Sequence, residues 1–333
     1  DYVIVIEEDL SDAVLSVVII ILGVCRIPTA WRKIWGGAVF SYVGLEWDMQ
    51  GFRLGLSQSR AEWLLGWLGR ALCEALLDLE DLEDVLGRMT FVYGVLVYDK
   101  PFLAPLFQTM ALKGTRGKIA KPLYVHMSLD WLERRLTIRR TMECRLPTFN
   151  HGLAYRVDVK AEGQQVALGG WRPVRCSTTG EIRKGLSPWF AVELTAATAP
   201  WAFHRGAPYR AISALELMGL TVGFHVFGID LVRSRGGLQL GQVSMSAGTD
   251  SQVAERISEK GAARTFPACC LAMELAALQE EFQCWFHGAW IPRERNWEAD
   301  ALTNMDFRGF KSEHRVEVDI QALQWRVLDR MLA

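Results

Sequence analysis

One acidic residue in an almost wholly apolar stretch is the feature that most restricts how this chain can fold. The segment 211–227, AISALELMGLTVGFHVF, contains a single carboxylate, Glu216, with apolar residues on every side. Burying an ionised glutamate is costly unless a cation or a hydrogen-bond donor pairs with it. Two interpretations are therefore open: a buried ion pair with an arginine such as Arg210, or a ligand of a metal ion.

Composition favours an intracellular globular chain of about two domains. Half of the 333 residues are hydrophobic, so sizeable cores can form and disorder is not expected. The seven cysteines are scattered and form no C-x-x-C pair, which favours reduced thiols and argues against a structural zinc site. We expect a location in the cytoplasm or the nucleus. Because the first residue is Asp1, we also expect the chain to be part of a longer polypeptide.

No membrane segment is expected. The longest apolar run lies between Asp12 and Arg26, and it is shorter than the ~20 residues that span a bilayer. Neither a basic region before it nor a cleavage site of small residues after it marks a signal peptide. We expect this run to form a buried helix.

Charge is unevenly distributed, although the formal net charge is only −1. Between Lys113 and Arg145 there are nine basic and three acidic residues, a local balance of nine minus three, or +6. Between Glu74 and Asp84 there are six acids and no base. Both runs are compatible with solvated surface, and the basic run also fits a stripe that faces phosphates.

The apolar pattern predicts a mostly helical first half with one small hairpin. The predicted elements are, in order, a short strand at 1–9, a helix over 12–24, a hairpin over 38–57, and helices from Ser57, over 82–97 and over 123–136. Two prolines in PFLAPLF, residues 101–107, are expected to break the second of these last three helices. We place the domain boundary between Pro147 and Gly152.

The second half alternates strands and helices, which predicts an α/β domain. The segment 153–171 is expected to form a strand, a turn and a second strand, and a third strand is expected at 189–195. The elements expected after it are, in order, a helix over 209–228, a strand at 238–250, helices over about 251–260 and 268–282, a strand at 284–292 and a helix from Trp297. This order indicates a mixed five-stranded sheet with flanking helices.

Three further carboxylates stand at distinctive places in that domain. Asp158 lies in the middle of a strand, where aspartate is disfavoured, Asp250 ends a strand, and Asp300 begins a helix. Each has an ordinary alternative. Asp158 could face outward on an edge strand, Asp250 could cap a helix, and Asp300 could be a stabilising acid in the first turn of one.

Together with Glu216, these acids can converge at one edge of a mixed sheet. Four carboxylates at close range would repel one another strongly, and a pair of Mg²⁺ ions would remove that cost. Two such ions also suit phosphodiester hydrolysis. Hard oxygen ligands favour Mg²⁺ or Mn²⁺ over zinc. We therefore predict that all four acids are metal ligands and catalytic residues.

The segments that carry them, RVDVKAEG, SALELMGL, GTDSQ and AWIPRERNWEADALTN, resemble the four acidic motifs of ribonuclease H. They are most similar to the ribonuclease H domains of eukaryotic retrotransposon reverse transcriptases, in which an IPxxxNxxAD ending is typical. The resemblance covers about residues 152–308. It implies a ribonuclease H-like fold and an endonuclease that cuts the RNA strand of RNA–DNA hybrids, recognised by shape and 2′-hydroxyls.

The resemblance also implies roles for individual residues. Asp158, Glu216 and Asp250 would hold two Mg²⁺ ions, Asp300 would complete the site, and water would attack the RNA phosphodiester in line. Independently of the resemblance, the position of Arg293, Arg295 and Asn296 beside the last motif is compatible with contacts to phosphates or with an ordinary polar loop.

The first half resembles the same retroelement enzymes. LGVCRIPTAWRKIWGG and FSYVGLEWD are similar to the end of a reverse-transcriptase palm and its primer-grip hairpin, and later segments are similar to the thumb and connection. Lys33 would match a palm lysine near the incoming nucleotide, and Asp1 an aspartate of the polymerase pair. The implied domains are a palm remnant with its hairpin at 1–56, the helical thumb and connection at 57–150, the ribonuclease H-like domain at 151–310 and a C-terminal extension at 311–333. A missing N-terminal polymerase portion would be a partner, and no polymerase activity is expected of this chain alone.

Some residues depart from the family pattern. Ser251 stands where asparagine is frequent, Trp290 stands where related elements often have histidine, and 58 positions separate Asp158 from Glu216. Two other functions therefore stay open: an inactive remnant that only binds nucleic acid, and an integrase-type strand-transfer enzyme. No P-loop, G-x-S-x-G or H-E-x-x-H pattern occurs, which excludes motif-based assignments to NTPases, serine hydrolases and zincins.

Overall fold

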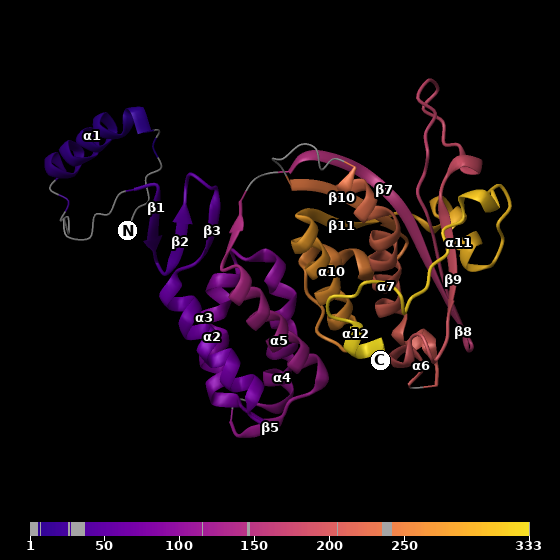
Figure 1. The fold of residues 1–333 in the computed structure, drawn as a ribbon, viewed down its shortest axis with the longest axis horizontal. Coiled ribbons are helices and arrows are strands. Elements are labelled where there is room, and N and C mark those ends of the chain that lie inside the picture. The colour runs from indigo at the N-terminus through magenta and orange to yellow at the C-terminus, as the bar shows by residue number, and fades with distance from the viewer. Residues whose placement is uncertain are drawn as a thin grey trace.

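The computed structural model describes residues 6, 8–25, 27, 37–114, 116–144, 147–204, 206–234 and 242–332. Asp1, Lys33 and most of the strand expected at 1–9 lie outside these residues. The described part of the chain contains a small sheet with a group of helices, followed by a larger sheet with helices of its own (Figure 1).

The helix expected over 12–24 forms as α1 (Ser11–Val24), but it is not buried. None of its fourteen residues is buried, and Ile20 and Val24 are 62% and 77% exposed. Figure 1 draws α1 at the far left, away from the large sheet. The prediction of a buried helix was therefore wrong, because an apolar sequence forms a core helix only where other elements cover it.

The predicted hairpin is a three-stranded meander. It consists of β1 (Val39–Tyr42), β2 (Leu45–Asp48) and β3 (Arg53–Leu56), which pair antiparallel in sequence order. A fourth strand, β6 (Thr141–Glu143), pairs with β3. Since β6 follows the helices in sequence, this sheet crosses the boundary predicted at residue 56.

Four helices lie between β3 and β6. They are α2 (Gln58–Cys73), α3 (Leu79–Tyr93), α4 (Lys100–Lys113) and α5 (Leu123–Ile138), with the short strands β4 (Leu76–Asp78) and β5 (Lys118–Ala120) paired between them. The helix expected over 82–97 ends at Tyr93, before PFLAPLF, but this segment is itself helical and belongs to α4. Pro101 occupies the first turn, where no backbone N–H is needed, and the buried Phe102 and Leu106 anchor the turn that includes Pro105.

Several residues of the basic run bind within the protein. Lys121 donates to the carbonyl of Leu72 at 3.0 Å, at the carboxyl end of α2. Arg140 contacts Glu46 at 2.7 Å, and Arg134 pairs with Asp130 at 2.9 Å. These contacts favour a structural role over a continuous stripe that faces phosphates.

The large sheet has five strands in the order β11-β10-β7-β8-β9. The strands are β7 (Pro147–Glu162), β8 (Gln165–Trp171), β9 (Trp189–Leu194), β10 (Gln242–Thr249) and β11 (Cys284–Trp290). β7 pairs parallel with β10 and antiparallel with β8, while β11 is parallel to β10. The predicted mixed five-stranded sheet is therefore confirmed, with the strand of Asp158 at its centre.

This half of the described chain also contains seven α-helices. They are α6 (Pro200–Phe203), α7 (Ile212–Gly223), α8 (Ile229–Arg233), α9 (Gln252–Lys260), α10 (Ala268–Phe282), α11 (Trp297–Thr303) and α12 (Asp329–Leu332). Gly219 of α7 lies against Val157 and Val159. α11 lies against Gly169, which pairs with Asp158 and therefore shares its face of the sheet. Because neighbouring residues of a strand point to opposite faces, α11 and α7 lie on opposite sides of the sheet.

One helical segment of the described chain, Pro208–Arg233, is long and apolar enough to cross a membrane. However, 72% of its apolar window is buried inside the protein. A core helix has this same character, and α7 provides part of the core between the sheet and α10.

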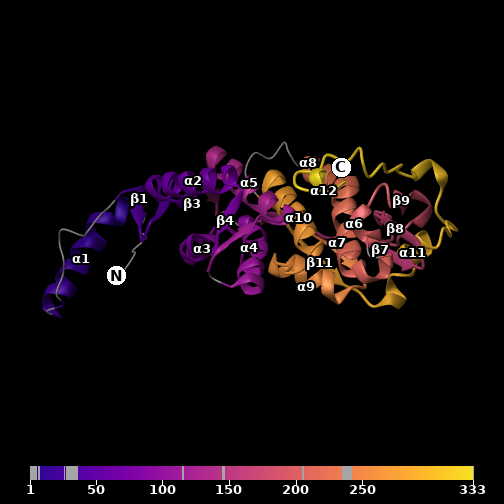
Figure 2. The same ribbon diagram turned by 90° about the horizontal axis from the view of Figure 1, so that it is seen from below.

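An ion cluster joins the helical region to the large-sheet region. Arg135 of α5 is 5% exposed and lies 3.3 Å from Glu280 of α10 and 3.6 Å from Asp99, the last residue of a short 3-10 turn (Val97–Asp99). Figures 1 and 2 both show α10 between α5 and α7. One continuous hydrophobic core includes residues of all three helices, so the two regions are packed together rather than loosely tethered.

The C-terminal extension is fastened by a buried carboxylate. Glu274 of α10 is 0% exposed and accepts backbone N–H groups from Arg326, Val327 and Leu328 at 2.7–3.1 Å. Farther along, Arg330 contacts Asp130 of α5 at 3.5 Å. The extension therefore connects α10 with the helical region.

We expect Glu274→Ala to lower the free energy of unfolding by about 2–4 kcal/mol, because three backbone donors would lose their acceptor. Hydrogen exchange at residues 326–328 should become much faster, and the melting temperature should fall. The control is Glu281→Ala, which removes a 44%-exposed partner of Arg326 and should cost less than about 1 kcal/mol. Unchanged exchange in the Glu274 variant would contradict this anchoring role.

Candidate active site

The central strand and α11 together place two of the predicted acids. Asp158 on β7 pairs in register with Gly169 on β8. A side chain at Gly169 would begin 2.7 Å from Leu302 Cβ and 2.9 Å from the Ala299 carbonyl oxygen. Glycine thus lets α11 lie directly on the sheet, which brings Asp300 toward Asp158.

Glu216 is brought to the same place by the first turns of α7. Its side chain is 6% exposed, and Thr249, the last residue of β10, donates to its Oε2 at 3.5 Å. In the part of the chain that the structure describes, Arg210 forms no ion pair with it. The interpretation of Glu216 as half of a buried Glu–Arg pair is therefore wrong.

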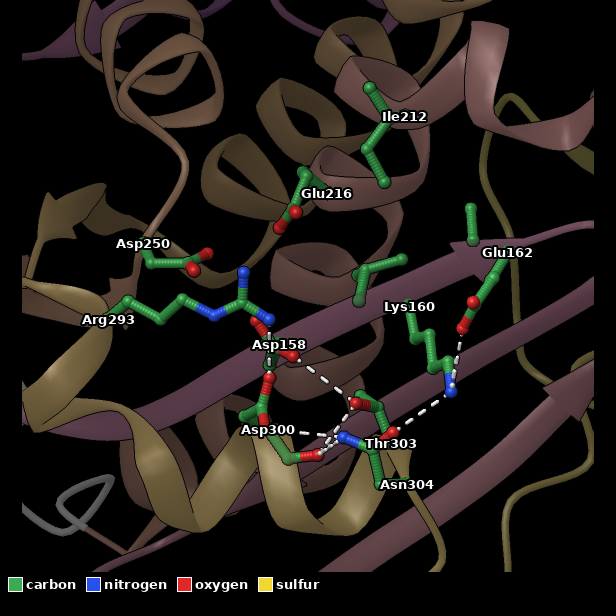
Figure 3. A pocket seen from close by; sticks show the side chains of 12 residues that line it. Asp158, Lys160, Glu162, Ile212, Glu216, Asp250, Arg293, Asp300, Thr303 and Asn304 are labelled. Carbon is green, nitrogen blue, oxygen red and sulfur yellow. Dashed lines mark hydrogen bonds and ion pairs between the residues drawn. The ribbon is translucent and has the colours of Figure 1, made fainter.

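All four predicted acids line one cleft of about 490 Å³ (Figure 3). The residues around it are Asp158, Val159, Lys160, Ala161, Glu162, Ile212, Glu216, Asp250, Arg293, Asp300, Thr303 and Asn304. Figure 3 shows the carboxylates of Glu216, Asp250 and Asp158 directed toward a shared space. The convergence expected from sequence order is thus present in the fold.

The acids in this cleft affect one another's protonation. Burial, and then the charges of Asp250 and Asp300, raise the pKa of Asp158 from 3.8 to about 7. Burial and the charges of Asp158 and Asp250 also raise the pKa of Glu216 well above its usual value. The Thr303 hydroxyl donates to Asp158 Oδ2 at 3.3 Å, and this hydrogen bond lowers the pKa of Asp158. Negative charge is therefore costly here unless a cation is close.

Three neighbours that the sequence did not single out hold the acids in place. Besides Thr303, Asn304 donates to Asp300 Oδ2 at 3.2 Å, and Lys160 donates to Asn304 Oδ1 at 3.0 Å. Thr303 and Asn304 follow Asp300 by three and four residues, the spacing that shares a helix face. That spacing was the available signal, although polar residues at a helix end are common.

The predicted phosphate contacts fall into different environments. Arg293 lines the cleft and its Nη2 lies 2.9 Å from Asp300 Oδ1. Arg295 is exposed beside it. Asn296 is 0% exposed and donates to the Val157 carbonyl at 2.9 Å. Since a buried side chain cannot meet a phosphate, Asn296 does not fit the predicted contact and instead supports the strand of Asp158.

The two departures from the family pattern also have structural roles. Ser251 caps α9, because its Oγ accepts the Ala254 N–H at 3.3 Å. Trp290 is 42% exposed, and its indole N–H donates to the Asp250 carbonyl at 3.2 Å. Trp290 therefore steadies the backbone of a predicted ligand but offers no proton-transfer group.

The chemistry of the donor set fits a hard divalent cation, because all four predicted ligands are carboxylates. As the side chains stand, however, no group of three or more His, Cys, Asp or Glu within the described residues could hold a metal ion. Asp300 is engaged by Arg293 and Asn304, and Asp158 by Thr303. Metal binding would therefore require side-chain rearrangement in the cleft.

Comparison with known proteins gives matches among solved structures only. No protein-family model and no curated protein sequence matches the chain. RNase H1 from the halophilic archaeon Halobacterium salinarum is 18% identical, with a TM-score of 0.26, over 46% of this chain and 96% of that one. The N-terminal RNase H domain of a Mycobacterium tuberculosis protein is 21% identical, with a TM-score of 0.26, over 46% and 92%.

A longer stretch of the chain matches a foamy viral protease-reverse transcriptase, solved in complex with double-stranded DNA. The identity is 11% and the TM-score is 0.25, over 75% of this chain and 38% of the viral one. The chain thus spans well under half of that viral protein. The strand order and the helices of the structure confirm the predicted α/β class, with a mixed sheet of five strands and flanking helices.

Gly169→Ala tests whether the close approach of α11 to the sheet builds the site. We expect a loss of about 1–3 kcal/mol in the free energy of unfolding, since the added carbon would meet Leu302 and the Ala299 carbonyl. The control is Gly87→Ala on α3, where nothing lies within 4 Å of an added Cβ and a small stabilisation should follow. Equal melting temperatures for Gly169→Ala and the unmodified protein would refute the packing argument.

The pKa of Asp158 predicts how stability depends on pH in the presence of a chelator. Its folded-state pKa, about 7, lies above the unfolded value of 3.8. Its contribution to stability is therefore complete below about pH 4 and is lost as the pH rises through about 7. Melting temperatures measured between about pH 5 and about pH 8 should show a component of decline that Asp158→Asn removes. An identical pH profile in that variant would count against this environment.

Proposed function

We propose that this chain is a metal-dependent endonuclease that hydrolyses the RNA strand of RNA–DNA hybrids. The observation that carries the proposal is that Asp158, Glu216, Asp250 and Asp300, spread over 143 positions (300 − 158 + 1), line a single open cleft. Two of them have pKa values raised by burial and by their acidic neighbours. A fold concentrates negative charge in this way at a cost, which cation binding would offset.

Magnesium, or manganese in its place, would be held by these four carboxylates, as a pair of ions. When bound, the ions would supply a nucleophilic water and stabilise the charge that develops on the phosphodiester. Asp158 and Glu216 would have to lose their protons first, so activity should increase with pH through about 7.

The remaining cleft residues would orient the acids and the substrate. Thr249 and Thr303 donate to Glu216 and Asp158, and Asn304 donates to Asp300, so three of the four carboxylates have a hydroxyl or amide that limits their rotation. Arg293 lines the cleft, and Arg295 is exposed in the same short turn, so both would attract the phosphates of a nucleic acid. Recognition would follow the shape of the hybrid and its 2′-hydroxyls.

The first half supports a wider proposal about origin. We infer that the small sheet and α2–α5 are the primer-grip hairpin, thumb and connection of a eukaryotic retrotransposon reverse transcriptase. The motifs in residues 22–107 support this inference, and an N-terminal polymerase portion would be the partner that completes the enzyme. Lys33 would contact nucleic acid in that larger protein, inside the cell.

A second candidate function is a catalytically inactive remnant that binds nucleic acid. The indole of Trp290 beside Asp250 favours it, because the side chain at that place cannot transfer a proton. Titration with Mg²⁺ distinguishes the candidates, since an intact site should bind the ion saturably and raise the melting temperature. Parallel assays on labelled hybrid and on double-stranded DNA would identify an integrase-type activity.

Asp158→Asn is the direct test of the nuclease proposal. We expect at least a ~100-fold loss of hybrid cleavage, because the central ligand would lose its charge, while the circular dichroism spectrum stays unchanged. The matched control is Asp84→Asn on the exposed face of α3, which should cleave normally. Full cleavage by the Asp158 variant would exclude this cleft as the active site.

A further inference from the structure

The guanidinium of Arg293 enters the cleft of the four acids. Arg293 begins a short 3-10 turn (Arg293–Arg295) after β11, and its Nη2 lies 2.9 Å from Asp300 Oδ1. Figure 3 shows the guanidinium between Asp250 on one side and Asp158 and Asp300 on the other. The side chain is 75% exposed, so its position depends on this charge contact far more than on packing.

This location places a positive charge at the point where the acids repel one another. The hydrogen bond to Asp300, and then the charges of Asp300, Asp158 and Asp250, raise the pKa of Arg293. Conversely, the positive charge of Arg293 lowers the pKa of Asp158 and of Glu216. Arg293 thus interacts electrostatically with every acid of the cleft.

A divalent cation bound to the same carboxylates would be repelled by the guanidinium of Arg293. Two positive groups within a few Å of one another repel, and an oxygen that receives an N–H bond has less charge to offer a metal. With the Arg293–Asp300 contact in place, no group of three or more His, Cys, Asp or Glu among the described residues could hold a metal ion.

We propose that Arg293 is an internal counter-cation that neutralises the cleft and that a divalent cation must displace. This inference rests on the proposed function, because it treats the four acids as metal ligands. Arg293 and the metal then compete for Asp300, so Arg293 weakens metal binding while it stabilises the metal-free protein. After displacement, its long exposed side chain is free to turn toward the phosphates of a substrate.

The competing explanation is an ordinary surface ion pair between Arg293 and Asp300. Such a pair contributes little to stability and would leave the affinity for a metal unchanged. The two explanations differ in one measurable quantity, the coupling between Arg293 and Mg²⁺.

The experiment measures Mg²⁺ binding to the full chain by calorimetry, without nucleic acid. We expect Arg293→Gln to tighten the Mg²⁺ dissociation constant by at least about five-fold, as for two ligands that exclude each other. Without Mg²⁺ this variant should melt at a lower temperature than the unmodified protein. Added Mg²⁺ should raise the melting temperature of the variant by more than that of the unmodified protein. Arg293→Lys keeps the positive charge, so its Mg²⁺ dissociation constant should stay close to that of the unmodified protein.

The matched control is Arg308→Gln, which removes another exposed arginine that pairs with an aspartate. Arg308 is 91% exposed, lies 2.6 Å from Asp306 and does not line the cleft. This variant should bind Mg²⁺ like the unmodified protein. Equal tightening by both variants would reduce the effect to general surface charge and overturn the specific role of Arg293.

The remaining outcomes separate this inference from the proposed function. If the unmodified protein binds Mg²⁺ saturably but Arg293→Gln binds it equally or more weakly, the counter-cation role is wrong and the metal site stands. If neither protein binds Mg²⁺ although both are folded by circular dichroism, the metal site itself is wrong, and the counter-cation role fails with it.

Discussion

Repulsion among four carboxylates in one cleft is the constraint on which the rest of this structure depends. Asp158 and Glu216 are each only 6% exposed, and neither has a salt bridge of its own in the described part of the chain. Hydroxyl groups of threonine and one guanidinium offset part of that cost. The fold can hold these carboxylates close together because the surrounding sheet and helices fix their positions.

The scaffold around the cleft is rigid for identifiable reasons. The long central strand β7 is paired on both sides, and the absence of a side chain at Gly169 lets α11 contact the sheet beside Asp158. On the far side of α7, α10 is fixed by Arg135 and by the extension that Glu274 anchors. The elements that carry the acids are therefore supported by both the helical region and the C-terminus.

Much of the second half could be predicted from its sequence, because each strand and helix there has a clear hydrophobic period. The mixed sheet and the meeting of Asp158, Glu216, Asp250 and Asp300 followed from that pattern. Predictions of burial failed where an apolar sequence pattern lies in a segment that no other part of the described chain covers. The apolar α1 is exposed because nothing in the described chain covers it.

The predicted contacts of individual polar residues were harder to obtain. Asn296 turned inward because the Val157 carbonyl needs a donor, and part of the basic run turned to carboxylates and a helix end. These contacts join residues that lie far apart in the chain, and Asn296 and Val157 are 139 positions apart. No periodicity or motif encodes such pairs.

The sequence by itself determined the order of elements and the isolated, costly position of Glu216, because both depend on which neighbouring residues are apolar. Only the tertiary structure decided what each acid contacts, that Arg293 lies on Asp300, and that α11 comes close enough to bring Asp300 to Asp158. The physical reason is range: hydrophobic patterning acts along a few turns or strand residues, whereas electrostatic and packing contacts depend on distances that exist only after the sheet and helices have assembled.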